Sequence, residues 1–274
     1  DVFDQADALG LARVTITGGE PLVFKDLDEL IEAIGPERFW INLDTNCWLL
    51  TDELAKHLKT IGVDRLQPSL DSLDPDEHDN FRKCKGSHER VMKSIDIAKR
   101  NNLGIFMQTV VTKSRLHSQE FLDYLSYFNG LGISVFVSFA KPVGAWEGHF
   151  EELIDKEDLK YMEELEKKYN VFTHLTPGYG VNEERLCVAA RNIFSITAHG
   201  DVLPCPYFHC SMGNVFNEPL KDILERCQAL KPFKKQTCLV AEDREFINKY
   251  LVNKIYGKDL PAGWQDVFDK EDFE

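Results

Sequence analysis

The chain has 274 residues, of which 43% are hydrophobic, and its formal net charge at pH 7 is −14. This size and composition allow a core large enough for one large domain, or for one domain with a smaller module. The acidic charge argues against a nucleic-acid partner, because contacts with phosphates need a basic face. The sequence also has no apolar run of the roughly 18 residues that indicate a membrane span.

Helix and strand patterns alternate through the first half of the sequence. In chain order we predict a helix over 2–11, a strand over 13–17, a helix over 27–34, a strand over 39–43, a helix over 52–61, a strand over 65–70, a helix starting at Asp74-Pro75, a helix over 87–101, a strand over 104–111, a helix over 119–128 and a strand over 134–139. Five strands separated by helices predict a parallel sheet or an open barrel, and therefore an α/β fold.

The second half has a different character. A charged helix over 155–169 and a loop over 176–180 precede a region of short strands and dispersed cysteines, and helices follow, one of them over 219–226. An acidic tail over 258–274 either docks on the body of the protein or is disordered. We therefore predict a second, small α+β module.

The cysteines indicate a reducing compartment and a local metal or cluster site. Their number, seven, is odd, which fits poorly with a closed set of disulfides, and five of them lie between Cys187 and Cys238. The first residues lack the basic start and the apolar segment of a secretory signal. We therefore predict a cytoplasmic protein.

The strand over 13–17 ends abruptly in Gly18-Gly19-Glu20-Pro21. In α/β barrels ligands bind at the C-terminal ends of the strands. Two glycines let a ligand approach the backbone closely, and Glu20 can accept hydrogen bonds from an ammonium group. An ordinary strand-to-helix turn is the simpler interpretation of these residues.

Polar residues also follow the next two strands, as Asp44-Thr45-Asn46 and as Ser69-Leu70-Asp71. The C-terminal ends of consecutive parallel strands lie at the same edge of a sheet or barrel, so we expect these side chains to lie near one another. Arg82 follows on a helix, and its guanidinium suits a carboxylate ligand. The alternative for Arg82 is a solvent-exposed pairing with Asp79.

The segment Thr17-Gly18-Gly19-Glu20-Pro21 resembles the Gly-Gly-Glu-Pro motif of radical S-adenosylmethionine (radical SAM) enzymes, and the two following polar segments resemble later motifs of that family. The resemblance implies a partial (β/α)6 TIM-like barrel over residues 1–150 that lacks its first strand here. It also implies that Gly18, Gly19 and Glu20 hold the amino group of S-adenosylmethionine (SAM). Further cofactor contacts are implied for Pro21, Asn46, Ser69, Asp71 and Arg82.

The catalytic cluster of this family is a [4Fe–4S] cluster held by Cys-x3-Cys-x2-Cys after the first strand. No cysteine precedes Cys47 in this sequence, so those ligands are absent from it. Either the sequence is a shortened version of a longer enzyme, which we favour because the other cofactor motifs are present, or the protein has lost the cluster. We predict that this chain as given does not cleave SAM reductively.

Cys187 and Cys205 stand at the spacing Cys-x12-Gly-x4-Cys, which predicts a β-hairpin with its turn at Gly200-Asp201. The spacing resembles the SPASM and shorter "twitch" extensions, which bind auxiliary [4Fe–4S] clusters. The resemblance implies a linker helix and loop over 151–180, an auxiliary-cluster module over 181–257 and the tail over 258–274.

The resemblance implies that Cys187, Cys205 and Cys238 ligate one auxiliary cluster. For the fourth ligand we rank Cys210 ahead of Cys227, which falls on a predicted helix. A zinc ion would also accept four thiolates and is the main competitor for this set.

As a whole, the resemblance implies an enzyme, a radical SAM oxidoreductase or maturase. Such an enzyme generates a 5′-deoxyadenosyl radical that abstracts a hydrogen atom from a peptide or small-molecule substrate, with a slight preference here for a peptide. A reducing partner such as a flavodoxin or a ferredoxin is also implied, and no residue is assigned a catalytic role. The alternatives are a non-catalytic barrel scaffold without the catalytic cluster and a zinc-stabilised barrel hydrolase or lyase.

Overall fold

The computed structural model describes residues 2–176, 187–235 and 237–274, and it divides into two compact units. The sheet unit comprises Gly10–Ser138 and Tyr161–Phe172. The cysteine unit comprises Asp1–Leu9, Phe139–Lys160 and Thr173–Glu274. Residues 177–180 of the predicted loop, and 181–186 of the predicted module, lie outside the described residues. The predicted domain boundaries stay a prediction.

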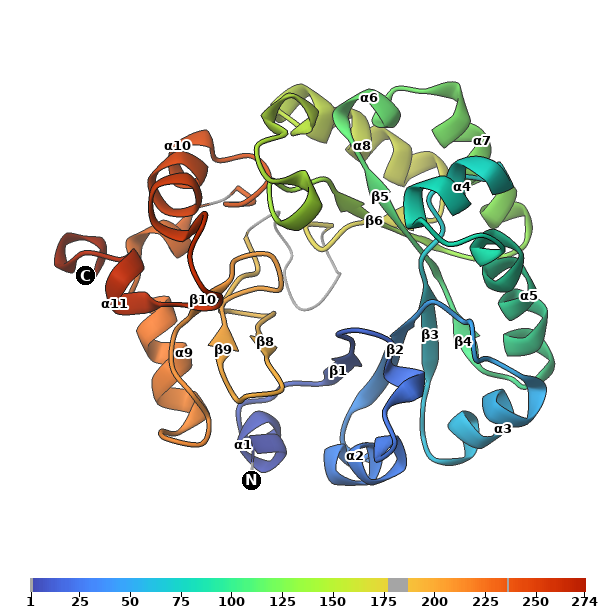
Figure 1. Cartoon of the computed structure of the whole chain (residues 1–274), viewed down its shortest axis with the longest axis horizontal. Helices are drawn as coiled ribbons and strands as arrows, with labels where there is room; N and C mark the ends of the chain where they lie inside the picture. Colours follow the sequence, from blue (N-terminus) through green and yellow to red (C-terminus); the bar gives the residue numbers. More distant parts are fainter. Residues whose placement is uncertain (1, 177–186, 236) are drawn as a thin grey trace. The chain divides into compact units, whose positions relative to one another are not determined.

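The sheet unit is built on parallel strands (Figure 1). They are β1 (Arg13–Ile16), β2 (Trp40–Thr45), β3 (Arg65–Pro68), β4 (Gly104–Ile105), β5 (Met107–Val111), β6 (Val135–Phe139) and β7 (Val171–Phe172). One sheet has the order β1-β2-β3-β4 and another the order β5-β6-β7, and a bridge between Ser69 and Gln108 joins the end of β3 to β5. The predicted α/β class is confirmed, whereas closure into a partial barrel stays a prediction.

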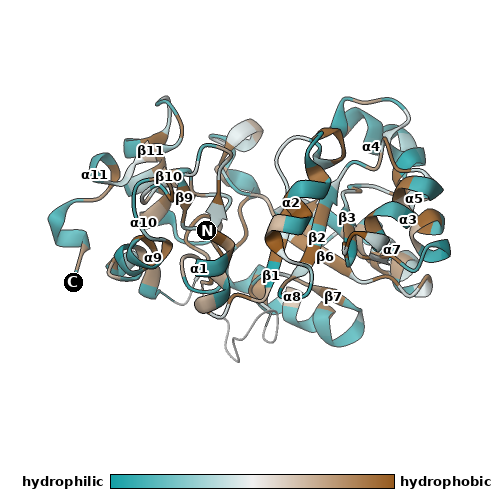
Figure 2. Cartoon of the chain, turned by 90° about the horizontal axis from the view of Figure 1, so that it is seen from below, coloured by the Kyte–Doolittle hydropathy of each residue, from teal (hydrophilic) through white to brown (hydrophobic). Residues whose placement is uncertain are grey.

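Helices follow the strands in alternation. They are η1 (Pro21–Val23), α2 (Leu27–Ile34), α3 (Asp52–Thr60), α4 (Pro75–Arg82), α5 (Ser87–Arg100), α6 (Lys113–Leu116), α7 (Gln119–Gly130) and α8 (Lys156–Lys168). Side-chain caps fix several of their starts, because Thr51, Asp74 and Ser118 each accept a backbone N–H of the first turn. Strand β6 is hydrophobic along most of its length (Figure 2), and β2 and β3 supply fully buried residues, Ile41, Leu43 and Leu66.

Strand β7 is an element that the sequence did not predict. It pairs in parallel with β6, with Val135 opposite Val171 and Phe136 opposite Phe172. The Phe172 ring packs 5.5 Å from that of Phe106 and 5.4 Å from that of Phe136, measured between centroids. A strand of two residues is too short to show an alternating pattern, so only this packing identifies it.

The cysteine unit is made of short elements. They are α1 (Val2–Ala8), η2 (Gly144–Trp146), η3 (Phe150–Glu152), β8 (Ser195–Ile196), β9 (Val202–Leu203), β10 (Cys210–Ser211), α9 (Leu220–Gln228), η4 (Lys231–Lys234), α10 (Arg244–Phe246), η5 (Ile247–Ile255), β11 (Ala262–Gly263), α11 (Trp264–Val267) and η6 (Lys270–Asp272). Gln5 of α1 accepts the backbone N–H of Leu220 at 2.7 Å, which ties α1 to the start of α9.

The predicted hairpin is confirmed. Strands β8 and β9 pair antiparallel, with Ser195 opposite Leu203, and Gly200 lies in the connecting turn with φ of +85°. A Cβ atom at Gly200 would come within 2.6 Å of the Phe216 ring, so a glycine is required there both for its backbone angle and for its size.

The tail over 258–274 docks on the cysteine unit. Strand β11 pairs in parallel with β10, and the buried Asp272 accepts hydrogen bonds from Lys249 and from the Tyr250 hydroxyl, both at 2.7 Å. Of the two outcomes predicted for the tail, docking is therefore the one observed. No helix among the described residues is long and apolar enough to cross a membrane.

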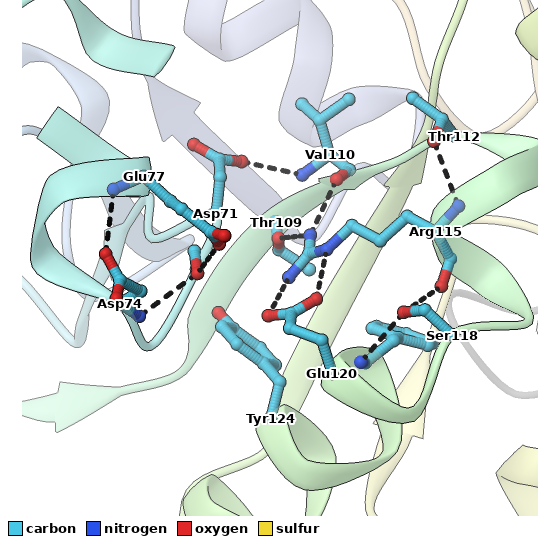
Figure 3. A network of polar contacts seen from close by, with 12 residues as sticks. Asp71, Asp74, Glu77, Thr109, Val110, Thr112, Arg115, Ser118, Glu120 and Tyr124 are labelled. Carbon is cyan, nitrogen blue, oxygen red and sulfur yellow. Dashed lines mark hydrogen bonds and ion pairs between the residues drawn. The ribbon is translucent and has the colours of Figure 1, made fainter. Parts of the chain in front are cut away.

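Arg115 of α6 joins β5 to α7 in the sheet unit. Figure 3 shows its guanidinium directed at Glu120 and at Thr109, with distances of 3.0 Å to Glu120 Oε2 and 2.6 Å to Thr109 Oγ1. The same guanidinium lies 5.1 Å from the centroid of the Tyr124 ring. The Tyr124 hydroxyl donates to the Leu70 carbonyl at 2.7 Å, so the network reaches the loop after β3.

We expect Arg115→Ala to lower the free energy of unfolding by about 2 kcal/mol, because it removes a partly buried ion pair, a hydrogen bond to Thr109 and a cation–π contact. Urea denaturation of the purified chain measures this loss. Arg100→Ala is the matched control: its pair with Asp52 is exposed to solvent, and we expect a clearly smaller loss than for Arg115→Ala. Equal losses in the two variants would contradict the claim that the contacts of Arg115 stabilise the fold more than the exposed Arg100–Asp52 pair does.

Candidate functional site

The two glycines that follow β1 leave the backbone open. Gly18 has φ of +133°, which favours glycine, and a Cβ atom at Gly18 or Gly19 would meet no other atom within 4 Å. Both residues are exposed. A ligand can therefore approach the main chain here without meeting a side chain.

Glu20 connects this turn to the end of β2. Its carboxylate accepts hydrogen bonds from the Leu22 N–H at 3.1 Å, the Thr45 hydroxyl at 2.7 Å and the Asn46 N–H at 2.7 Å. Three of the roughly four acceptor positions of the carboxylate are thus occupied by its own chain, and one remains for an external donor such as an ammonium group. The structure therefore brings together two residues of the predicted cofactor site, Glu20 and Asn46.

Asp71 and Arg82 form an ion pair, with 2.6 Å between Arg82 Nε and Asp71 Oδ2. The buried Asp71 also accepts the Val110 N–H at 3.0 Å, so it bridges the loop after β3 to β5. The alternative pairing of Arg82 with Asp79 is wrong, because Asp79 instead accepts the backbone N–H groups of Gly86 and His88. Both members of the pair belong to the predicted site, and Asp71 orients Arg82.

Asp44 is a second unusual carboxylate of the sheet unit; it lies in a polar segment identified from the sequence but was not assigned there to the site. It lies on β2 opposite Gln67 of β3, and it is hydrogen-bonded with Thr17. Its Oδ1 atom is buried and has no hydrogen-bond partner in the described part of the chain. Burial raises the pKa of Asp44 to about 7, against the weaker opposing effect of Thr17. A group that titrates near neutrality at the C-terminal end of a strand is a candidate for proton exchange with a ligand.

Three cysteines converge in the cysteine unit. Electrostatic interactions link Cys187 with Cys205, Cys205 with Cys238, and Cys238 with Cys187. The residue two positions after each cysteine, which is Ala189, Tyr207 or Val240, donates its backbone N–H to the sulfur. We call Cys187, Cys205 and Cys238 the cysteine triad.

The triad fits a thiolate-bound cluster by its chemistry. Burial raises the pKa of the thiols to about 11 for Cys187 and about 12 for Cys205 and Cys238, so the free thiols stay protonated at neutral pH. Iron would hold them as thiolates, and N–H donors stabilise negative charge on the sulfurs of iron–sulfur clusters. Among the described residues, no three His, Cys, Asp or Glu side chains gather closely enough to hold a single metal ion.

Cys210 lies elsewhere. Its sulfur is 4.0 Å from that of Met212, and it interacts electrostatically with Cys227 of α9. Both cysteines of this pair are fully buried. The prediction that Cys210 completes the ligand set therefore gains no support from its surroundings, and the pair reads as small buried hydrophobic side chains.

Comparisons with known proteins agree with this arrangement. A family model described as the radical SAM superfamily matches residues 1–125, and a model described as the SPASM iron–sulfur cluster-binding domain matches residues 187–245. The second match begins at the first cysteine of the triad and includes the other two.

Curated relatives match over most of their length. A GTP 3′,8-cyclase of Nautilia profundicola is 31% identical over 248 residues, which cover 82% of this chain and 76% of the relative. An AdoMet-dependent heme synthase of Methanosarcina barkeri is 25% identical over 256 residues, covering 84% of this chain and 72% of the relative.

Solved structures share the fold. SuiB of Streptococcus suis aligns with a TM-score of 0.62 at 19% identity, over 81% of this chain and 57% of SuiB, so the chain spans less than two thirds of that protein. The protein anSMEcpe with bound AdoMet aligns with a TM-score of 0.61 at 16% identity, over 85% of this chain and 73% of anSMEcpe. The chain belongs to the radical SAM superfamily and carries a SPASM iron–sulfur cluster-binding domain in its second half.

Proposed function

We propose that this chain binds S-adenosylmethionine and an auxiliary iron–sulfur cluster, and that it acts as a radical SAM enzyme that modifies a small-molecule or peptide substrate by hydrogen-atom abstraction. The observation that carries the proposal is the cysteine triad, in which three distant segments bring thiols together and give each sulfur a backbone N–H donor. When bound, SAM and a reduced [4Fe–4S] cluster supply the 5′-deoxyadenosyl radical.

The residues of the sheet unit bind and orient the cofactor in this proposal. Gly18 and Gly19 leave the backbone accessible, and the remaining acceptor position of Glu20 takes the ammonium group. Arg82 is held by Asp71 through its Nε atom, which leaves other guanidinium N–H groups for a carboxylate. Ser69 and Pro21 complete the proposed contacts.

The names of the relatives bear on the substrate. Those that match most of this chain are a GTP cyclase and heme synthases, which are named for small molecules. A peptide is named in structures of anSMEcpe and SuiB, whose likeness to this chain extends to the fold alone. We therefore place a small molecule ahead of a peptide, which reverses the preference drawn from the sequence.

The test is anaerobic purification of the protein encoded by the complete gene, followed by quantification of iron, sulfide, zinc and released 5′-deoxyadenosine. Iron and sulfide together with deoxyadenosine support the proposal. Bound cluster without deoxyadenosine supports the scaffold alternative. Zinc without iron or sulfide supports the zinc-stabilised hydrolase or lyase.

Glu20→Gln tests the cofactor site directly. We expect the dissociation constant for SAM to rise at least about tenfold, because the variant loses the negative charge and turns an acceptor oxygen into an N–H donor facing backbone N–H groups. Isothermal titration with SAM measures the change. Glu29→Gln, at an exposed glutamate of α2, is the control and should bind as the wild type does. An unchanged dissociation constant for SAM in Glu20→Gln would show that Glu20 does not bind the cofactor.

A further inference from the structure

The cysteine triad supplies three ligands, and a cluster of four irons has a fourth position. We propose that the imidazole of His174 binds the fourth iron of the auxiliary cluster through Nε2. This inference rests on the proposed function, since it requires that the triad holds a [4Fe–4S] cluster. It places a histidine where Cys210 was predicted from the sequence.

The first observation is position. His174 Nε2 lies 3.8 Å from the sulfur of Cys238. The His174 ring also lies 6.5 Å, centroid to centroid, from the ring of Tyr207, the residue that donates its N–H to the sulfur of Cys205. His174 therefore stands beside Cys238 and next to the ring of Tyr207, which follows Cys205 by two positions.

The second observation is that the backbone around His174 is fixed. Thr173 and Leu175, its neighbours in the chain, are both buried. The Thr173 N–H donates to the Thr176 hydroxyl at 2.8 Å, and the Leu175 N–H donates to the Thr173 hydroxyl at 3.0 Å. These contacts hold a tight turn, so the fold fixes the backbone that carries the imidazole.

Other nearby groups are less suitable. Cys210 is engaged with Cys227 and Met212, as described above. His209 makes a contact with the Pro206 carbonyl at 3.2 Å. Glu242 interacts electrostatically with Cys187 and Cys238, but its Oε1 atom accepts the Cys238 N–H at 3.0 Å. Carboxylate oxygen is also a harder ligand than imidazole, and soft sites favour sulfur and nitrogen donors.

The consequence is a cluster with one negative charge fewer than an all-cysteine cluster would carry. Replacement of thiolate by imidazole raises the reduction potential of an iron–sulfur cluster, as it does in Rieske centres. His174→Cys should therefore lower the midpoint potential of the auxiliary cluster, and His174→Ala should leave one iron without a protein ligand.

The experiment uses the full chain, grown with 15N-labelled histidine and reconstituted anaerobically with ferrous iron and sulfide. Pulsed EPR of the reduced cluster should show a strong coupling to a directly bonded 15N nucleus. This coupling should vanish in His174→Ala and remain in the control His209→Ala. Redox titration should give a lower midpoint potential for His174→Cys than for the wild type.

The outcomes separate this inference from the proposed function. A wild-type cluster that assembles but shows no coupling to labelled histidine overturns the assignment of His174 alone, and no variant is needed for that result. The same holds if the coupling disappears in His209→Ala instead. A wild-type chain that takes up no iron and sulfide overturns the auxiliary cluster itself, and the inference with it.

Discussion

Replacing Cys205 with alanine is expected to reduce the iron and sulfide bound per chain by at least about tenfold after anaerobic reconstitution, because a cluster does not persist on two thiolates. Cys205 interacts with both Cys187 and Cys238, so its removal is expected to disrupt the binding position of the cluster. Iron bound by this chain reports on the second half of the sequence, since Cys47 and Cys84 are the only cysteines before Cys187.

Cys210→Ala is the matched control for this measurement. It removes a buried thiol from the same unit but from the pair with Cys227, which lies outside the triad. We expect this variant to keep the wild-type content of iron and sulfide and to lose about 1 kcal/mol of stability, as small core deletions do. Circular dichroism of both apo variants checks that neither change unfolds the chain.

A different result would identify the ligand set just as clearly. If Cys210→Ala loses its iron while still folded, then Cys210 is a ligand, as ranked from the sequence, and the triad as defined here is incomplete. If Cys205→Ala keeps its iron, the auxiliary-cluster proposal fails, because the hairpin spacing on which it depends then has no role in binding.

Local elements were predictable because local physics determines them. Alternating strand and helix patterns predicted the five longer strands, and a helix was predicted to start at Asp74, which caps it by accepting a first-turn N–H group. Gly200 was placed in the hairpin turn for its backbone freedom, and the structure shows the positive φ and the close Phe216 ring. In each of these cases the cause lies within a few residues of the effect.

Pairings between distant segments were less predictable. Arg82 was expected to bind a carboxylate, and the carboxylate that it meets is Asp71, a residue of the same predicted site. Cys210 is nearest to the hairpin in sequence, but β10 directs it toward Cys227, whereas His174 approaches Cys238 from 64 residues away. Closeness along the chain suggested Cys210 as a ligand, whereas closeness in the folded structure suggests His174.

Asp44 carries the second large effect, and its sign follows from the shift of its pKa. The ordinary value of 3.8 applies to the unfolded chain, and burial raises the folded value to about 7. Below pH 4 the carboxyl is protonated in both states and has no effect. As the pH rises from 4 to 7 the unfolded state releases the proton while the folded state retains it, so the folded state loses stability through that window.

We expect Asp44→Asn to remove this penalty, because an amide does not titrate and can still bond with Thr17. The variant should gain stability relative to the wild type as the pH rises through the window, by up to about 4 kcal/mol above pH 7. Urea denaturation of both proteins at pH 4.5 and pH 7.5 measures the difference.

Asp52→Asn is the control with the opposite sign. Asp52 is exposed, and hydrogen bonds from Arg100 and Asn101 lower its pKa in the folded state. Its loss should therefore cost stability above pH 4 and change nothing below its folded pKa. If Asp44→Asn and the wild type keep a constant difference across the window, Asp44 is not a buried, neutral carboxyl. The proposed exchange of a proton between Asp44 and a ligand requires a carboxyl group with a raised pKa. A constant difference would therefore also exclude that role for Asp44.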